Sequence, residues 1–374
     1  MIDFYIKMKK ALIVLPTYNE AGNIEKLIEK IFAQQTKTKI WEINILVVDS
    51  QSIDDTANIV KKLQKKYQRL YFLSTKKQGL GRAYIDGFSY AIKKINPYLF
   101  FEMDADFSHD PNLIPRFLER IEKGADFVVG SRYIKGGSIP KEWSFHRKIF
   151  SILGNLIARF GFMKLRITDW TSGYRAIKAW LVREALSYLK NYSGYVFQVA
   201  FLDYAIKNNA TIEEIPLKFY ERKYGVSKIN SPQYIVQTII YIFLNSSFIK
   251  FVIVGFLGFL IDFGILYFFI NKVHIPSVHI WLAQAVSAEA AIINNFIFNN
   301  FWSFSYKKIT DNFFSSFLKF NFISLGAIVI QMALLQILVN LFGRSFWIIY
   351  KILIIAFVII PYSYFLYNKV VWKK

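Results

Sequence analysis

The first part of the chain alternates short apolar runs with segments whose apolar residues recur at helical spacing. Residues 11–16 form the first apolar run, and residues 23–32 behind it have the spacing of an amphipathic helix. A short apolar run bounded by turn residues is typical of a buried parallel strand. Such strands are predicted at residues 11–16, 45–49, 70–73, 100–103 and 126–130. Strands alternating with helices indicate an α/β domain with a largely parallel sheet.

Turn and capping residues mark where the helices of this part begin. Residues 52–55, Ser-Ile-Asp-Asp, follow the second strand and have the composition of a helix cap. Residues 79–82, Gly-Leu-Gly-Arg, open another helix after the third strand. Ligands of open parallel sheets bind at the carboxyl ends of the strands. Pro16, Asp49 and Asp104 lie at such ends, so we expect them to meet at one crevice.

After about Pro232 the pattern changes to long apolar stretches. Residues 250–270 are nearly all apolar and are long enough to span a bilayer. Further stretches of this kind occupy residues 281–304, 314–342 and 346–367. Four stretches of about 20 residues or more cannot be the core of a soluble protein. We therefore predict a transmembrane domain of four spans over residues 250–374.

Polar residues interrupt the apolar stretches. They are Asp262, Glu289, Asn294, Asn295, Asn299 and Asn300. Polar groups are costly in lipid, so these side chains are expected to face the interior of the helix bundle. Hydrogen bonds between helices are the interpretation we favour, and a transport path is the alternative.

Residues 145–163, between the two parts, are predicted to form an amphipathic helix. Its apolar face holds Ile149, Leu153, Leu156, Ile157 and Phe160, and its polar stripe holds Arg147, Ser151, Asn155 and Arg159. Such a helix suits a membrane interface, and a helix packed on the sheet is the alternative. Residues 234–244 are a second candidate for an interfacial helix. The predicted domains are residues 1–230, an interfacial linker at 231–249, and the spans.

Composition narrows the classes of partner. The chain has 374 residues, a formal net charge of +21 and 54% hydrophobic residues, which indicates two unlike regions. The absence of cysteine excludes disulfides, thiolate catalysis and cysteine-ligated zinc. The lysines of residues 1–10 are not followed by a long apolar run, so no N-terminal signal peptide is expected. The positive charge suits a membrane surface and phosphorylated substrates, which makes a nucleic-acid partner unnecessary.

Asp104 and Asp106 are the residues around which the first part is organised. They end the apolar run 100–103, and alternation along an extended chain points them the same way. Two neighbouring carboxylates repel, so a site that keeps both ionised normally holds a cation. Hard oxygen ligands without cysteine favour Mg²⁺ or Mn²⁺ over zinc or copper. The alternative is a solvated turn after the strand.

Several other kinds of site are excluded or weakly supported. The chain has no GxxxxGK[ST] motif, and residues 79–81 lack the third glycine of a dinucleotide fingerprint. No Ser-His-Asp arrangement is evident among only four histidines. His109, beside the acids, is more often a loop side chain than a metal ligand in such a position.

Six short motifs in order resemble the family 2 glycosyltransferases of GT-A fold, in particular their dolichol-phosphate mannose synthase branch. They are Leu15–Glu20, Val47–Asp49, Asp104–Asp106, Gly130–Tyr133, Asp169–Arg175 and Phe219–Lys228. The resemblance covers about residues 9–230. The QxxRW motif of processive synthases is absent, which favours transfer of a single sugar. Residues 294–304 are similar to the GtrA-like four-helix domain that is fused to some of these enzymes.

The resemblance implies a nucleotide-sugar donor site and a divalent metal. Asp49 and Val47 are expected at the nucleotide, with Pro16, Tyr18 and Glu20 lining the same pocket. Asp104 and Asp106, with Ala105 between them, are expected to hold Mn²⁺ or Mg²⁺ on the diphosphate. Family members often have glutamine where this chain has Ser108, a shorter ligand, so its part in metal binding is an open question.

The resemblance also implies cationic residues around the reacting groups. Arg222 and Lys228 lie on a segment rich in glycine and serine and are expected to close over the diphosphate, unless they belong to a solvated basic loop. The positions of three further residues lead us to expect that they hold the acceptor phosphate: Arg132 follows a strand end near the expected metal, and Arg147 and Ser151 share one face of the 145–163 helix. An arginine fork also matches phosphate geometry. A phosphate acceptor is already an anion. Asp169 is therefore expected to orient Arg132 or the sugar more than to act as a base.

The implied function is inverting transfer of one hexose, most plausibly mannose from GDP-mannose, to dolichyl or polyprenyl phosphate. A UDP-glucose-dependent glucosyltransferase and a non-catalytic binder or flippase of a lipid carrier are the alternatives. Basic residues between the spans fix the orientation. One side holds Lys307, Lys308, Lys319, Lys369, Lys373 and Lys374, and the other holds Lys272 and Arg344, with Lys351 near the boundary of the fourth stretch. This asymmetry predicts an integral membrane protein with a cytoplasmic catalytic domain, which in a prokaryote lies at the plasma membrane.

Overall fold

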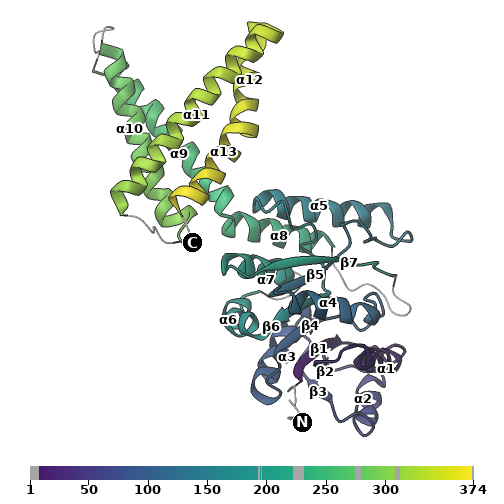
Figure 1. Ribbon diagram of the computed structural model, residues 1–374. Helices are drawn as coiled ribbons and strands as arrows, with labels where there is room; N and C mark the ends of the chain where they lie inside the picture. The colour runs from purple at the N-terminus through teal and green to yellow at the C-terminus, as the bar shows by residue number, and fades with distance from the viewer. Residues whose placement is uncertain are drawn as a thin grey trace, which may run out of the picture. The chain divides into compact units, whose positions relative to one another are not determined.

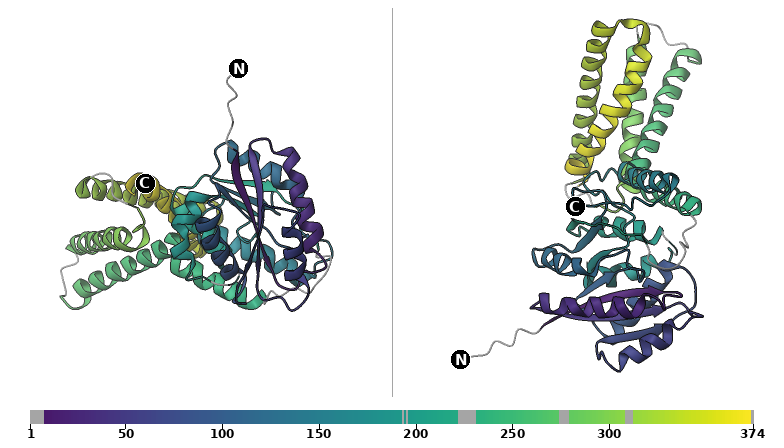
Figure 2. Two further views of the ribbon diagram at one scale, coloured as in Figure 1. Left: turned by 90° about the horizontal axis from the view of Figure 1, so that it is seen from below. Right: turned by 90° about the vertical axis from the view of Figure 1, so that its right-hand side faces the viewer.

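The computed structural model describes residues 8–192, 194, 196–221, 231–273, 279–307 and 312–372. The backbone divides into two compact units: residues 1–160 with 164–242, and residues 161–163 with 243–374. The first unit contains the sheet, and the second contains the long apolar helices (Figures 1 and 2). The boundary at residue 242 lies inside the segment 231–249 that the sequence assigned to a linker.

A seven-stranded sheet forms the centre of the first unit, in the order β3-β2-β1-β4-β6-β5-β7. The five strands predicted from sequence are β1 (Lys9–Thr17), β2 (Trp41–Asp49), β3 (Leu70–Ser74), β4 (Leu99–Glu102) and β5 (Phe127–Ser131). Their neighbours run parallel except at β6, which pairs antiparallel with both β4 and β5. The predicted α/β architecture is therefore confirmed.

Two strands were missed by sequence reasoning, β6 (Arg175–Lys178) and β7 (Ile212–Pro216). The sequence of β6 is Arg-Ala-Ile-Lys, and that of β7 is Ile-Glu-Glu-Ile-Pro. Neither has the apolar run that marked the other strands. Arg175 is nevertheless fully buried, because its charge is paired inside the unit.

Helices cover both faces of the sheet. In chain order they are α1 (Ile24–Ala33), α2 (Thr56–Gln64), α3 (Leu80–Lys94), α4 (Ile114–Glu122), α5 (Phe145–Gly161), α6 (Ala179–Leu189), α7 (Val196–Lys207) and α8 (Ser231–Asn245). Alternate side chains of β1 serve the two faces. Ala11, Ile13 and Leu15 pack with α1, α2 and α4 in one core. Val14 lies on the other face, close to α3.

Gly87 allows α3 to lie directly on the sheet. A Cβ atom at this position would come within 2.8 Å of the Val48 side chain and 3.1 Å of the Val14 side chain. Gly87→Ala is therefore expected to lower the free energy of unfolding by about 1–3 kcal/mol through overpacking. Thermal unfolding of the detergent-solubilised protein measures this loss. Gly154→Ala is the matched control, since a Cβ there meets nothing within 4 Å, and equal losses for both variants would contradict the packing argument.

The predicted amphipathic helix is observed as α5, Phe145–Gly161. Its buried residues include Asn155 and Ala158, whereas Leu153 and Phe160 are 46% and 57% exposed. The polar stripe thus packs on the domain, and the apolar face points outward. Helix α8 packs beside it, and its exposed residues include Val236 and Ile240. In a helix on the surface of a soluble protein the apolar face is buried and the polar face is exposed. The reverse arrangement here supports an apolar environment outside α5 and α8.

The second unit contains four helical segments long and apolar enough to cross a membrane. They are Ser247–Asn271, Ile280–Ser303, Phe313–Phe342 and Arg344–Val371, close to the four predicted spans. The first is α9, and the third is α11. The second consists of α10 (Ile280–Phe298) followed by a short π-helical segment, Asn299–Ser303. The fourth begins with α12 (Trp347–Ile354) and continues through a π-helical segment, Ile355–Ile359, into α13 (Ile360–Leu366). A further π-helical segment, Tyr367–Val371, ends it.

Polar residues of the spans form hydrogen bonds between helices, as expected. Asp262 of α9 accepts a hydrogen bond from the hydroxyl of Ser287 on α10 at 2.6 Å. The indole of Trp372 donates to the Asn300 side chain at 3.1 Å. The first bond joins the consecutive helices α9 and α10, and the second joins the end of the fourth span to the end of the second, as the interhelical interpretation predicted. Glu289 differs, because it is exposed.

Candidate active site

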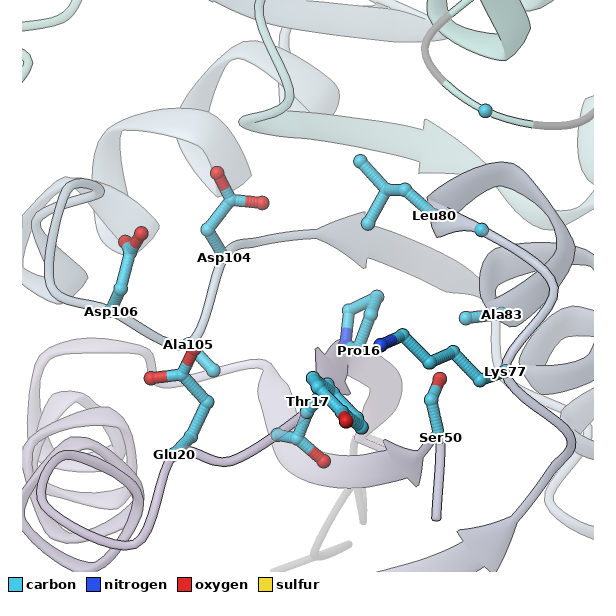
Figure 3. A pocket seen from close by; sticks show the side chains of 13 residues that line it. Pro16, Thr17, Glu20, Ser50, Lys77, Leu80, Ala83, Asp104, Ala105 and Asp106 are labelled. Atoms are coloured by element: carbon cyan, nitrogen blue, oxygen red, sulfur yellow. The ribbon is translucent and has the colours of Figure 1, made fainter. Parts of the chain in front are cut away.

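A pocket of about 320 Å³ lies where the strands β1 and β4 end. Its wall includes Pro16 and Thr17 at the end of β1, Tyr18 and Glu20 after β1, Ser50 after β2, Lys77 and Gly79 after β3, and Asp104, Ala105 and Asp106 after β4 (Figure 3). Leu80, Ala83 and Gly194 complete it. The parallel strands place these loops at one edge of the sheet, which is where ligands of such sheets bind.

Asp104 and Asp106 share one wall of this pocket. Figure 3 shows both carboxylates directed to the same side of the loop. The backbone N–H of Ser108 donates to Asp106 Oδ1 at 3.0 Å. This short turn requires a left-handed residue, and Phe107 adopts it with φ of 65°. The loop thus fixes two carboxylates in one place, at the cost of local backbone strain.

His109 positions Asp104 from behind. Its Nδ1 accepts a hydrogen bond from the backbone N–H of Asp104 at 3.0 Å, and its ring stacks on Tyr174 at 4.9 Å between centroids. The His109 side chain is buried, and Nε2 is 3.8 Å from Asp104 Oδ2. These contacts agree with the loop role that we favoured over that of a metal ligand.

The donor set fits a hard cation that also binds substrate. Asp104 and Asp106 supply carboxylate oxygens, the ligands that Mg²⁺ and Mn²⁺ prefer. Among the described residues, no group of three or more histidine, aspartate or glutamate side chains forms a cage for a metal ion. Mg²⁺ is commonly bound through one or two carboxylates, with substrate phosphates and water completing its shell. The pocket therefore suits an ion that arrives with a phosphorylated ligand.

Three of the expected donor or metal residues lie behind the pocket wall. Val47 is fully buried in β2. Asp49 is also buried, and its carboxylate accepts hydrogen bonds from the hydroxyls of Thr17 at 3.1 Å and Ser52 at 2.5 Å. Ser108 is fully buried, and its observed contact with the site is the N–H bond to Asp106. In this arrangement Asp49 and Ser108 shape the loops that line the pocket.

Lys77 lines the pocket and was missed by sequence reasoning. Its ammonium group lies 3.7 Å from the centroid of the Tyr18 ring, a cation–π contact across the cavity mouth. The sequence did contain a signal, which was the position of Lys77 shortly after the end of a strand. Asp49 was predicted at the pocket for the same reason, because it ends β2. A basic residue there adds positive charge to a pocket that contains several acids.

Arg132 and Asp169 form a buried bidentate ion pair. Arg132 Nε and Nη2 donate to the two carboxylate oxygens of Asp169, both at 2.7 Å. Arg132 Nη2 also donates to the hydroxyl of Thr171 at 2.7 Å. Desolvation alone would raise the pKa of Asp169. The charge and hydrogen bonds of Arg132 outweigh it and hold that pKa below its usual range. Asp169 therefore orients Arg132, one of the two roles expected for it.

Helix α5 is tied to the same network through its polar stripe. The hydroxyls of Ser151 and Tyr133 are 2.6 Å apart. Asn155 donates to Thr171 at 3.2 Å and accepts from the backbone of Trp170 at 2.7 Å. The structure thus places Ser151 beside Tyr133, the neighbour of Arg132 in the chain. Ser151 does not line the pocket that contains Asp104 and Asp106.

Arg147 lies at the start of α5, partly exposed. Its guanidinium stacks 4.0 Å from the Trp143 ring centroid, and Nη1 lies 3.4 Å from Glu221 Oε1. Glu221 immediately precedes residues 222–230, so the expected site residues Arg222 and Lys228 lie outside the described part of the chain. The contact links α5 to Glu221.

A second buried charge pair lies behind the acids. Arg175 donates to the backbone carbonyls of Gln198 and Trp170, and its Nε is 4.0 Å from Glu102 Oε2. Burial raises the pKa of Glu102 to about 7, although the charge of Arg175 opposes this rise. Arg175 therefore holds the loop 170–174 to β4, which explains why this arginine belongs to the Asp169–Arg175 motif.

Comparison with known proteins places this arrangement in a family. Residues 12–188 match the model of glycosyl transferase family 2, and residues 250–372 match that of the GtrA/DPMS transmembrane domain. The dolichol-phosphate mannosyltransferase of Pyrococcus furiosus is 33% identical over 89% of this chain and 91% of its own. The chain is a family 2 glycosyltransferase of the dolichol-phosphate mannosyltransferase type. It is an integral membrane protein with a GtrA/DPMS transmembrane domain.

Two bacterial relatives match the catalytic part of this glycosyltransferase. The polyprenol monophosphomannose synthase of Mycolicibacterium smegmatis is 34% identical over 59% of this chain and 82% of its own. The undecaprenyl-phosphate mannosyltransferase of Micrococcus luteus is 35% identical over 59% of this chain and 88% of its own. Among solved structures, a glucosyl-3-phosphoglycerate synthase of Mycobacterium tuberculosis covers 63% of this chain and 79% of its own, with 16% identity and a TM-score of 0.47.

Proposed function

We propose that this glycosyltransferase moves one mannosyl group from GDP-mannose to the phosphate of a dolichyl or polyprenyl lipid. The observation that carries the proposal is the shared wall formed by Asp104 and Asp106 in a pocket at the strand ends. The relatives named as dolichol-, polyprenol- and undecaprenyl-phosphate mannosyl enzymes support the sugar and the acceptor class. The four apolar spans and the exposed apolar face of α5 support a lipid acceptor.

Asp104 and Asp106 would hold a divalent ion, Mg²⁺ or Mn²⁺, together with the donor diphosphate. Such an ion, when bound, neutralises charge that develops on the leaving diphosphate. Tyr18, Glu20 and Pro16 line the same cavity and are positioned to bind the rest of the donor. Lys77 adds a positive charge at the mouth, and Arg222 and Lys228 remain candidates for covering the diphosphate.

The chemistry needs positioning more than a general base. An oxygen of the lipid phosphate attacks the anomeric carbon, that carbon's bond to the diphosphate oxygen breaks, and GDP leaves with inversion. The attacking phosphate is already ionised at neutral pH, so no proton has to be removed. Asp169 has a lowered pKa and both oxygens on Arg132, which suits an orienting role. The protein supplies alignment and charge neutralisation.

Arg132, Arg147 and Ser151 are proposed to hold the acceptor phosphate. Arg147→Lys keeps the charge and loses the planar fork and the stacking on Trp143. This variant is expected to raise the apparent KM for polyprenyl phosphate about tenfold, with the KM for the donor unchanged. Steady-state transfer at varied acceptor and saturating donor measures the shift.

Arg159→Lys is the control for this prediction. Arg159 lies on the same stripe of α5, but its Nη2 donates to the carbonyl of Leu165 at 2.7 Å. Its acceptor KM should stay close to that of the wild type. Wild-type acceptor kinetics in both Arg147→Lys and Ser151→Ala would show that the phosphate binds elsewhere.

The distribution of lysines supports a cytoplasmic catalytic domain. The loop between the second and third spans contains Lys307, and the end of the fourth span contains Lys369. Lysine and arginine gather on the cytoplasmic side of membrane proteins, and the even number of spans returns the chain to the side on which it started. In a prokaryote this places the donor site on the inner face of the plasma membrane.

A donor panel tests the proposed substrate. The full-length protein, purified in detergent, is incubated with polyprenyl phosphate and either labelled GDP-mannose or labelled UDP-glucose. Label is expected in the lipid phase with GDP-mannose. Transfer from UDP-glucose alone would identify the glucosyltransferase alternative, and no transfer from either donor would support the non-catalytic one.

A further inference from the structure

Two ionisable side chains of opposite sign lie exposed within the spans. Glu289 belongs to the second span, Ile280–Ser303, and Lys351 belongs to the fourth, Arg344–Val371. Both are exposed on the second unit. No hydrogen bond or ion pair joins either side chain to another residue in the part of the chain that the structure describes. Such groups are costly in lipid and are normally paired.

The two side chains lie at similar distances along their helices from the first residue of each span. Consecutive spans run in opposite directions, so the second and fourth begin at the same end of the unit (Figure 1). Glu289 is about 13 Å along the axis from Ile280, at 1.5 Å per residue. Lys351 is about 12 Å from Arg344, because the first three residues form a 3₁₀ turn with a larger rise. Counted along the helices, the two side chains are therefore about equally far from that end of the unit.

The two side chains belong to different helix pairs. Helix α10 packs on α9, and α12 packs on α11. Figures 1 and 2 place the beginnings of α10 and α12 on opposite sides of the unit. Each charge thus faces outward from its own helix pair.

Equal depth is the condition for pairing between two copies in one membrane. Copies inserted in the same direction are related by an axis along the membrane normal, and rotation about it preserves depth. A two-fold axis also makes each contact reciprocal, so one interface would form two identical pairs. Ala285, exposed one turn before Glu289, leaves room for a partner helix to approach.

We propose that this chain dimerises in the membrane through ion pairs between Glu289 of each copy and Lys351 of the partner subunit. The surface consists of the exposed side of α10 around Glu289 and the exposed side of α12 around Lys351. The pairing neutralises two charges in lipid, and it does not depend on the identity of the donor or acceptor. Its partner is a second copy, because this chain itself supplies both complementary charges.

Cysteine cross-linking tests the proposal directly, because the chain contains no cysteine. Full-length Glu289→Cys with one affinity tag is co-expressed with Lys351→Cys with another, and membranes are treated with a mild oxidant. A disulfide-linked species that contains both tags is expected. The control pair is Glu289→Cys with Ile349→Cys, since Ile349 is exposed at a similar depth on a different side of α12. It should give little linked species.

The doubly substituted chain separates the two ways of pairing. If Glu289→Cys/Lys351→Cys forms its disulfide only within one chain, the pair closes the helix bundle and the dimer is refuted. Absence of any disulfide between positions 289 and 351 also refutes it. Linkage between differently tagged chains supports it.

Charge reversal provides a second measurement without cysteine. Glu289→Lys and Lys351→Glu are each expected to raise the dissociation constant of the dimer in liposomes about tenfold. Each substitution removes a Glu289–Lys351 ion pair at both of the equivalent contacts in the dimer. The double reversal should restore the wild-type dimer fraction, measured by single-molecule photobleaching of labelled chains. Failure of the double variant to recover would contradict the ion pair.

Discussion

Asp106→Asn is expected to lower the rate of sugar transfer about a thousandfold, because stabilisation by a metal ion is worth several kcal/mol. The substitution keeps the size of the side chain and an oxygen that can accept from the N–H of Ser108. It removes the negative charge that, with Asp104, would hold a divalent ion on the diphosphate. The fold should persist, since the substituted side chain has the same shape and can still accept the N–H bond that holds the loop.

Two measurements check this prediction. Steady-state transfer gives the loss of rate, and calorimetric titration with GDP, with and without Mn²⁺, gives the loss of metal-dependent binding. Ser108→Ala is the control, because it keeps the backbone N–H on Asp106 and removes only a buried hydroxyl. A loss in Ser108→Ala as large as that in Asp106→Asn would make Ser108 a ligand. Wild-type turnover by Asp106→Asn at saturating Mn²⁺ would remove the metal assignment.

Asp169→Asn is expected to cost both stability and activity. Its carboxylate is fully buried and accepts from Arg132 Nε, Nη2 and the backbone N–H. An amide group offers a donor where two donors already point. Breaking one side of a buried ion pair costs about 3–5 kcal/mol, because the remaining charge stays buried without compensation. We therefore expect a lower unfolding temperature and, since Arg132 loses its fixed position, a much lower transfer rate.

Asp126→Asn is the matched control for this loss. Asp126 pairs with Lys178 at 3.0 Å, but both side chains are partly exposed. An ion pair in contact with water contributes about 1 kcal/mol or less, so the control should be mildly destabilised. Equal destabilisation of the two variants, measured by thermal unfolding in detergent, would contradict the account of the buried pair.

The lowered pKa of Asp169 sets the sign of its pH dependence. A carboxylate whose pKa is lower in the folded state stabilises the protein above its unfolded pKa of about 3.9, and that stability is lost as pH falls through the folded value. The transfer rate should therefore show no ionisation of Asp169 between pH 5 and 8. A rate that follows a group in this range, and loses that dependence in Asp169→Asn, would make Asp169 the general base.

The positions of the strands that form the pocket were predictable because each is a buried apolar run that ends in a polar residue. Asp104 and Asp106 follow from that pattern, because they come directly after the run that forms β4. Their shared direction was predicted from alternation along an extended chain, but β4 ends at Glu102, and a turn with left-handed Phe107 holds the two carboxylates. The strands β6 and β7 were not predictable in this way. Arg175 is buried through its ion pair and backbone contacts, and periodicity carries no signal for a partner so distant in sequence.

The chemistry of single side chains was harder to predict than their location. Asp49 ends its strand as expected, but its carboxylate lies behind the wall of the pocket, where it accepts hydrogen bonds from the hydroxyls of Thr17 and Ser52. Lys77 lines the pocket because the loop after β3 places its ammonium group over the Tyr18 ring. Both outcomes depend on loop geometry, which short motifs do not encode. In the second unit, length and composition alone were sufficient to locate the spans, because lipid permits no other arrangement of such stretches.

The most direct test of the proposed function is the mass of the lipid product. The full-length protein in bilayer nanodiscs is given GDP-mannose and polyprenyl phosphate, and the lipid fraction is analysed by mass spectrometry with and without a metal chelator. The account predicts polyprenyl phosphate carrying a single hexose, formed in the presence of Mg²⁺ or Mn²⁺ and absent both with chelator and with Asp106→Asn. Unmodified lipid under all conditions, or the same yield with Asp106→Asn, would contradict it.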